Sequence, residues 1–161
     1  MNKDVTAPLS ILFLCLGNIC RSPLAEGAAR AAFAAAGIDV TLDSAGTGDW
    51  HVGHPPDRRA QAEARRRGID ISALRARQLT RNDFYDFDLI LAADETNLRD
   101  ARAIRPADAT AELMLMLDLL PGRAGEGVRD PYYGGDEGFA ATWEDVAAVA
   151  SALVARCSTS G

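Results

Sequence analysis

Residues 10–23, SILFLCLGNICRSP, are the stretch that decides the fold. Ser10–Cys15 is a short, continuous apolar run, and this pattern is typical of a fully buried parallel strand. Ser22 as N-cap and Pro23 at the first helical position predict a helix that continues to residue 36 and ends at Gly37. A buried strand that turns directly into a helix predicts an α/β fold.

Strands and helices alternate along the rest of the chain. Further strands are predicted over residues 40–44, 87–92 and 112–117, although the last of these, ELMLML, fits a helix equally well. Further helices are predicted over residues 57–67, 95–104 and 137–156, and loops over residues 46–56 and 128–135. We therefore expect one domain, residues 1–161, built as a three-layer α/β sandwich around a four-stranded parallel sheet. Ligands of such sheets bind beyond the carboxyl ends of the strands, and Cys15 lies at such an end.

The amino-acid composition bears on whether the protein binds nucleic acid or a membrane. The 161 residues are 48% hydrophobic and 25% charged, an ordinary balance for one globular domain. The formal net charge of −6 argues against a nucleic-acid partner, which requires a basic surface. No run approaches the roughly 18 apolar residues of a membrane span, and the first apolar run lacks the cleavage site of a secretory signal. We therefore expect a cytoplasmic protein without a membrane partner, and the sequence does not indicate an oligomeric state.

Cysteine, histidine and lysine usage excludes several kinds of site. The three cysteines, Cys15, Cys20 and Cys157, argue against a disulfide framework in a chain without a secretory signal. The only histidines, His51 and His54, have no cysteine or carboxylate beside them at metal-ligand spacing, so neither a metal nor another cofactor is expected. The single lysine lies outside any Gly-rich loop, which excludes a phosphate-loop NTPase.

The segment between the first strand and the first helix predicts a phosphate-binding loop. A strand-to-helix turn directs successive backbone N–H groups inward, and the helix N-terminus adds about half a positive charge. Gly17 and Asn18 tolerate the positive φ angles that a tight loop can require. We expect the phosphate to be bound by Leu16, Gly17, Asn18, Ile19, Cys20, Arg21 and Ser22.

Cys15 and Arg21 supply the chemistry of this loop. The five residues between them let the loop wrap a tetrahedral oxyanion, with the sulfur beneath it and the guanidinium beside it. The planar fork of an arginine matches two phosphate oxygens. A thiol at a helix N-terminus beside a cation ionises more readily than a free cysteine, so we expect Cys15 to be a thiolate nucleophile. We also expect the Ser22 hydroxyl to hydrogen-bond this sulfur.

These motifs resemble the low-molecular-weight protein tyrosine phosphatases. The matching segments are residues 15–23 (CLGNICRSP), 130–134 (DPYYG), 44–47 (SAGT), 76–78 (ARQ) and Trp50. The resemblance covers nearly the whole chain and implies a metal-free hydrolase of phosphotyrosine-containing proteins, with a phosphocysteine intermediate on Cys15. It implies that Arg21 clamps the phosphate and that Asp130 is the general acid of the first step and the general base of the second.

The resemblance also assigns the walls of the substrate pocket. A phenol has a pKa of about 10, so the leaving oxygen needs a proton, and a positioned carboxyl group such as that of Asp130 typically contributes about 10²–10⁴ in rate. Gly134 lets the surrounding segment fold over the pocket. Trp50 and Tyr132, with Tyr133 near them, are implied to line the entrance, where aromatic rings would stack on the phenyl ring of the substrate.

Two residues of the predicted site have more than one interpretation. Cys20 is either a packed residue of the loop or, as the resemblance implies, a resolving thiol that forms a reversible disulfide with oxidised Cys15. Many family members carry a histidine that supports the loop asparagine, and this chain has Leu74 in its place. We therefore expect Asn18 to be held by other partners, such as Ser44 or backbone groups.

Two other functions compete with this interpretation. An arsenate reductase has a similar fold and loop, but it needs a relay of two further cysteines, and Cys157 lies four residues from the end of the chain. A phosphotyrosine-binding module would need only the loop amides and the arginine, so the additional nucleophile and acid argue for catalysis. The sequence does not decide the physiological substrate, nor whether Tyr132 or Tyr133 is itself phosphorylated.

Overall fold

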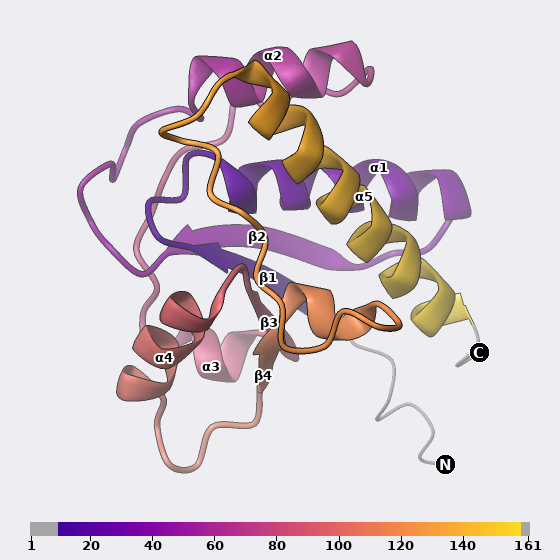
Figure 1. Ribbon diagram of the computed structural model, residues 1–161. Coiled ribbons are helices and arrows are strands. Elements are labelled where there is room, and N and C mark those ends of the chain that lie inside the picture. Colours follow the sequence, from indigo (N-terminus) through magenta and orange to yellow (C-terminus); the bar gives the residue numbers. More distant parts are fainter. Residues whose placement is uncertain (1–9, 159–161) are drawn as a thin grey trace.

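Strands and helices alternate along the chain in the computed structural model, which describes residues 10–158 (Figure 1). The strands are β1 (Ser10–Cys15), β2 (Thr41–Gly46), β3 (Leu89–Ala92) and β4 (Glu112–Leu115). The helices are α1 (Arg21–Ala36), α2 (Arg58–Arg66), α3 (Asp83–Asp86), α4 (Glu95–Ile104), the 3₁₀ helix η2 (Met116–Leu119) and α5 (Asp136–Ser158).

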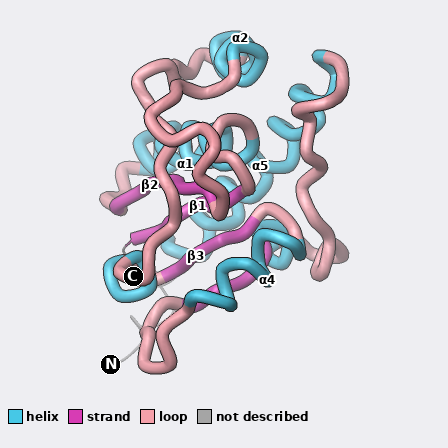
Figure 2. Tube along the Cα trace, turned by 90° about the vertical axis from the view of Figure 1, so that its left-hand side faces the viewer, coloured by secondary structure: helices cyan, strands magenta, loops and turns pink. Residues whose placement is uncertain are grey.

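The four strands form one parallel sheet in the order β2-β1-β3-β4. The sheet lies between two helical layers, with α1, α2 and α5 on one side and α4 on the other (Figure 2). This confirms the predicted three-layer sandwich with its four-stranded parallel sheet. Strand β2, which follows β1 in sequence, lies on one side of β1, and β3 lies on its other side. The strand order therefore reverses at β1, and the carboxyl end of β1 is the topological switch point of the sheet. Ligands of doubly wound sheets bind at such a point.

Strand β1 contributes to the core on both faces of the sheet. Ile11, Phe13 and Cys15 belong to the same hydrophobic cluster as α1 and α5, whereas Leu12 and Leu14 pack with residues of α3 and α4. This alternation follows from the two-residue period of a strand. Burying one large apolar side chain contributes roughly 1.5–3 kcal/mol, so the strand is strongly anchored from both sides. The end of β1, and with it Cys15, is therefore held in a fixed position.

Helix α5 has 23 residues and, by length and apolar composition alone, could cross a membrane. In this fold it crosses α1 (Figure 1) and is packed against it. Its buried apolar residues recur every three or four positions and thus form one helical face: Phe139, Trp143, Val146, Val149 and Leu153. The apolar composition of α5 is accounted for by this packing.

The prediction that Ser22 caps the first helix is wrong. Helix α1 begins one residue earlier, at Arg21, and Cys20 occupies the N-cap position without a capping side chain. The Ser22 hydroxyl instead lies 3.1 Å from the sulfur of Cys15 and accepts a hydrogen bond from Asn18. The predicted end of the helix is confirmed, because Gly37 has a left-handed backbone with φ of 71°.

The other differences are shifts of element ends. β2 extends to Gly46, because it pairs with β1 as far as Cys15, and β3 begins only at Leu89. The interpretation of the fourth segment as a strand is confirmed, but β4 ends at Leu115, whose amide donates to the Asp118 carboxylate at 3.1 Å as the chain turns into η2. Helix α3 was not predicted, since its four residues are too few to carry a periodic pattern.

Helix α2 contains a buried carboxylate that is bound by two arginines. Glu63 is 1% exposed, and its two oxygens accept hydrogen bonds from Arg66 and Arg67, the latter at 2.9 Å. Burial alone would raise the pKa of Glu63, but the hydrogen bonds and charges of the two arginines lower it below its ordinary value of 4.5. The ion pairs therefore keep this carboxylate charged inside the fold.

We expect Glu63→Gln to lower the free energy of unfolding by about 1–3 kcal/mol at pH 7. Because the pKa of Glu63 is lower in the folded state, its carboxylate takes up a proton first in the unfolded chain as the pH falls. The contribution of Glu63 to the free energy of unfolding therefore declines as pH falls below 4.5. Urea unfolding of both proteins at pH 7, 5, 4 and 3 measures the difference. A difference that stays constant over this range would contradict the role given to the charge.

Candidate active site

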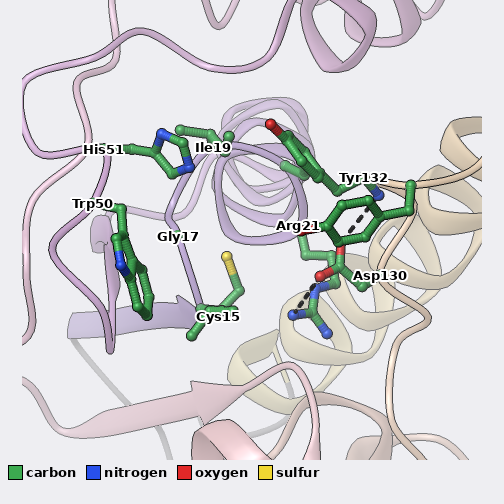
Figure 3. A pocket seen from close by; sticks show the side chains of 11 residues that line it. Cys15, Gly17, Ile19, Arg21, Trp50, His51, Asp130 and Tyr132 are labelled. Atoms are coloured by element: carbon green, nitrogen blue, oxygen red, sulfur yellow. Dashed lines mark hydrogen bonds and ion pairs between the residues drawn. The ribbon is translucent and has the colours of Figure 1, made fainter.

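A cavity of about 410 Å³ opens over the carboxyl end of β1. Its floor is the loop that follows Cys15, and its wall on one side is formed by Arg21 and Asp130 (Figure 3). Of the seven predicted loop residues, five line this cavity: Leu16, Gly17, Ile19, Cys20 and Arg21. The side chains of Asn18 and Ser22 are buried behind the loop, where they hold it.

Asn18 is the residue that fixes the shape of the loop. Its φ of 58° is the only positive φ of a non-glycine residue within residues 10–158, and Gly17 does not share it. The Asn18 amide nitrogen donates to the hydroxyls of Ser22 at 2.7 Å and Ser44 at 3.0 Å, and its oxygen accepts from the Arg77 amide at 3.0 Å. Of the two residues expected to tolerate a positive φ, Asn18 is therefore the one that adopts it. At Gly17 the available space is limiting, since a Cβ on this residue would lie 3.0 Å from the His51 ring.

Leu74, at which the family resemblance implies a histidine in other members, is a partly buried apolar residue. Leu74 packs against the larger hydrophobic cluster. Ser44, which supports Asn18, donates to the buried carboxylate of Glu26 at 2.7 Å, and Glu26 is in turn bound by Arg30 at 2.6 Å. A chain of hydrogen bonds from α1 through β2 thus reaches the loop without a histidine.

The Ser22 hydroxyl lies between Asn18 and the sulfur of Cys15. Because Asn18 donates to its oxygen, the hydroxyl hydrogen is available for the Cys15 sulfur, 3.1 Å away. Cys15 itself is 3% exposed, at the bottom of the cavity. A thiolate here would accept a hydrogen bond from Ser22.

Arg21 is 2% exposed and is oriented by groups from two other parts of the chain. Its Nη1 donates to Asp94 at 2.7 Å and to the Val128 carbonyl at 2.9 Å, and its Nη2 lies 3.6 Å from Asp130. Burial would lower the pKa of Arg21, but the neighbouring Cys15 and the carboxylates of Asp94 and Asp130 raise it. The guanidinium is a fixed positive charge beside the sulfur.

Asp94 was missed by the sequence analysis. It follows β3 and caps α4, accepting the Asn97 amide with one oxygen at 2.9 Å and Arg21 with the other. A carboxylate directly after a buried strand, at the same sheet edge as Cys15, was a signal that could have identified it. His51, which also lines the cavity, was missed as well, although it adjoins Trp50.

Asp130 lies across the cavity from Cys15, in the segment that precedes α5 (Figure 3). One carboxylate oxygen accepts the Tyr132 amide at 3.1 Å, and the other is the one nearest Arg21. The side chain is 39% exposed, so a proton can pass between it and a bound molecule or water. This combination of a fixed orientation and access to the cavity suits proton transfer.

Aromatic side chains form the rim. Trp50 is 67% exposed and Tyr133 is 93% exposed, and the ring of Tyr133 meets that of Tyr132 edge-on with centroids 4.9 Å apart. The His51 ring lies 6.5 Å from the Tyr132 ring. These four residues line the same cavity, so a planar ring that enters it would pass between aromatic surfaces.

Cys20 is a buried free thiol in the loop. Its burial and the nearby carboxylate of Asp57 raise its pKa well above the ordinary value. Cys20 is therefore held in its protonated form. Cys15 is a free thiol as well.

We expect Asn18→Ala to destabilise the fold by more than Asn18→Gly does. Both variants remove the hydrogen bonds to Ser22, Ser44 and Arg77, but only alanine also suffers the cost of the left-handed backbone, about 1–2 kcal/mol. The smaller entropy of the unfolded alanine variant offsets part of this cost, by about 0.4–1 kcal/mol. Chemical denaturation of the two variants measures the difference, and equal stabilities would contradict the role given to φ.

Comparison with known proteins points to one family. The family described as low molecular weight phosphotyrosine protein phosphatase matches residues 10–160. A low molecular weight phosphotyrosine protein phosphatase of Schizosaccharomyces pombe is 43% identical over 138 residues, which cover 84% of this chain and 88% of that one. A protein tyrosine phosphatase structure from Entamoeba histolytica superposes with a TM-score of 0.88 at 30% identity and covers 94% and 97% of the two chains. DARP, a Drosophila arginine phosphatase, superposes with a TM-score of 0.84 at 30% identity and covers 90% and 95%. The chain belongs to the low molecular weight phosphotyrosine protein phosphatases.

Proposed function

We propose that the protein hydrolyses phosphotyrosine in proteins through a phosphocysteine intermediate on Cys15. The observation that carries this proposal is that Cys15 and Arg21, at the two ends of the phosphate loop, face one cavity with Asp130 from a distant segment. Family membership supports the reaction class, and the three residues provide a nucleophile, a cation and a proton donor for it.

In the first step the Cys15 thiolate attacks the phosphorus, so that an S–P bond forms and the ester P–O bond breaks. The phenolic oxygen leaves with the proton of the Asp130 carboxyl group. The loop amides and the Arg21 guanidinium stabilise the charge that develops on the phosphoryl oxygens. Within residues 10–158, Nε of Arg21 has no hydrogen-bond partner and Nη2 has only the Asp130 contact at 3.6 Å, so both can bind phosphate.

In the second step Asp130, now a carboxylate, takes a proton from water, and the resulting nucleophile attacks the phosphocysteine. The S–P bond breaks, inorganic phosphate leaves and the thiolate of Cys15 is restored. The Ser22 hydroxyl, 3.1 Å from the sulfur, stabilises the thiolate as it leaves. The carboxyl group thus ends the cycle protonated, as it began it.

The rim supports an aryl phosphate as substrate. Trp50 and Tyr132 present aromatic surfaces above a nucleophile that lies at the bottom of the cavity, which suits a phosphate carried on a phenyl ring. A Drosophila arginine phosphatase is among the structures similar to this chain, so a phosphoarginine peptide is a suitable comparison substrate.

The position of Cys157 argues against an arsenate reductase. It lies on α5, which starts beside the site at Asp136 and ends at the opposite side of the molecule (Figure 1). With a rise of 1.5 Å per residue, the helix separates Cys157 from its start by about 30 Å. A thiol relay from Cys15 through Cys20 to Cys157 has no short path in this fold.

We also propose that Cys20 protects oxidised Cys15 by forming a disulfide with it, and that the protein acts in the cytoplasm. The two loop cysteines, Cys15 and Cys20, are free thiols, which suits a reducing compartment. The raised pKa of Cys20 means that this thiol reacts only after losing a proton, so the disulfide should form more slowly than between two ionised cysteines.

We expect the reduced protein to hydrolyse para-nitrophenyl phosphate in the presence of a chelator. Cys15→Ser should abolish turnover, and Asp130→Asn should lower kcat/KM for phenyl phosphate, a poorer leaving group, by about 10²–10⁴. A phosphotyrosine peptide should be hydrolysed faster than a phosphoarginine peptide of the same sequence. Absence of turnover in the freshly reduced parent protein would refute the proposed function, and a preference for phosphoarginine would refute the substrate class.

A further inference from the structure

We infer that Arg59, outside the catalytic cavity, is a positioning residue that holds the segment carrying Asp130. The inference rests on the proposed function, in which Asp130 must meet the leaving oxygen. It concerns a link between α2 and the segment of residues 130–135, which is called the acid loop below.

Arg59 binds the backbone of the acid loop with both ends of its guanidinium. Nη2 donates to the Tyr132 carbonyl at 2.9 Å, and Nη1 donates to the Gly134 carbonyl at 3.2 Å. The guanidinium carbon also lies 5.6 Å from the ring centre of Tyr132 and 4.8 Å from that of Phe139, at distances that allow cation–π attraction. One side chain thus contacts the acid loop and the first turns of α5.

The same guanidinium is held from behind by Asp57. Nε and Nη2 of Arg59 each donate to the Asp57 carboxylate at 3.1 Å, and the Arg59 amide donates to it at 2.8 Å. The Asp57 amide in turn donates to the carbonyl of Ile19 in the phosphate loop at 2.8 Å. Asp57 and Arg59 therefore connect the loop that binds phosphate to the loop that carries the acid.

The acid loop has few other anchors. Residues 132–135 are exposed, and the hydrogen bond from the Gly134 amide to the Pro131 carbonyl, 3.0 Å, lies within the loop itself. Among residues 10–158, Arg59 is the only residue of another element whose side chain hydrogen-bonds the backbone of residues 130–135. Without Arg59, the orientation of Asp130 would depend on the buried Pro131, on the exposed turn with its Gly138–Gly135 backbone hydrogen bond, and on the 3.6 Å contact with Arg21.

Arg58 provides a matched control. It is the neighbouring residue in the first turn of α2, it is exposed, and its side chain has no hydrogen bond or ion pair to any residue that the structure describes. Arg58→Gln and Arg59→Gln remove the same charge from the same turn, so they differ in the contact with the acid loop.

The first experiment follows the acid loop without requiring turnover. Hydrogen–deuterium exchange of the peptide that covers residues 128–138 should be about tenfold faster in Arg59→Gln than in the parent protein, because the loop opens more often. In Arg58→Gln it should match the parent. Equal exchange in the two variants would overturn the inference, even if the protein showed no phosphatase activity.

The second experiment asks whether Arg59 acts through Asp130. Arg59→Gln should lower kcat/KM for phenyl phosphate about tenfold and for para-nitrophenyl phosphate by less, since the better leaving group needs less protonation. In an Asp130→Asn background, Arg59→Gln should cost nothing further, because the group that it positions is gone. If the losses multiply, or if both substrates lose equally, Arg59 is only structural while the proposed function stands.

Discussion

The burial of the Arg21 guanidinium is the constraint on which the site depends. A cation that is 2% exposed must be surrounded by acceptors, or the fold would suffer the full cost of removing it from water. Its partners come from separate parts of the chain, namely Asp94 after β3, the Val128 carbonyl, and Asp130 before α5. Satisfying one charge therefore brings together the ends of two strands and the acid loop. The arrangement that stabilises the cation also surrounds the sulfur of Cys15 with the groups that its chemistry needs.

Much of the fold could be predicted because its signals are local. The apolar run of β1, the left-handed Gly37 and the capping carboxylate of Asp57 each act within a few residues, and the phosphate loop is continuous in sequence. The role of Arg59 was not predictable, because it depends on a contact with Tyr132, 73 positions away. The position of Asp94 after a buried strand could have indicated a site residue, but its pairing with Arg21, also 73 positions away, could not be predicted. Ser22 shows a third case: its expected contact with the sulfur of Cys15 is confirmed, whereas the helix cap predicted for it is wrong and its hydrogen bond from Asn18 was not predicted.

The site separates into a rigid floor and an open rim. Asn18 and Ser22 behind the floor and Arg21 beside it are buried, and each has specified hydrogen-bond partners. On the rim, Trp50 and Tyr133 are mostly exposed, so replacing them would cost the fold little. Asn18 is held behind the floor by the Ser44 hydroxyl and the Arg77 amide, as expected from the sequence for Ser44 and backbone groups. The residues that govern reactivity thus also contribute to the stability of the fold, whereas the residues that would contact the substrate at the rim contribute little to it.

The placement of the two tryptophans has an optical consequence. They are the only tryptophans in the chain, and Trp50 at the mouth is 67% exposed while Trp143 in the core is 8% exposed. An indole in water emits at longer wavelength than one among apolar groups, and only the exposed ring can be reached by a dissolved quencher. Light from Trp50 therefore reports whether something occupies the mouth, and light from Trp143 reports whether the core is intact. The molecule carries an unlabelled pair of fluorophores that distinguishes a filled cavity from a loosened fold.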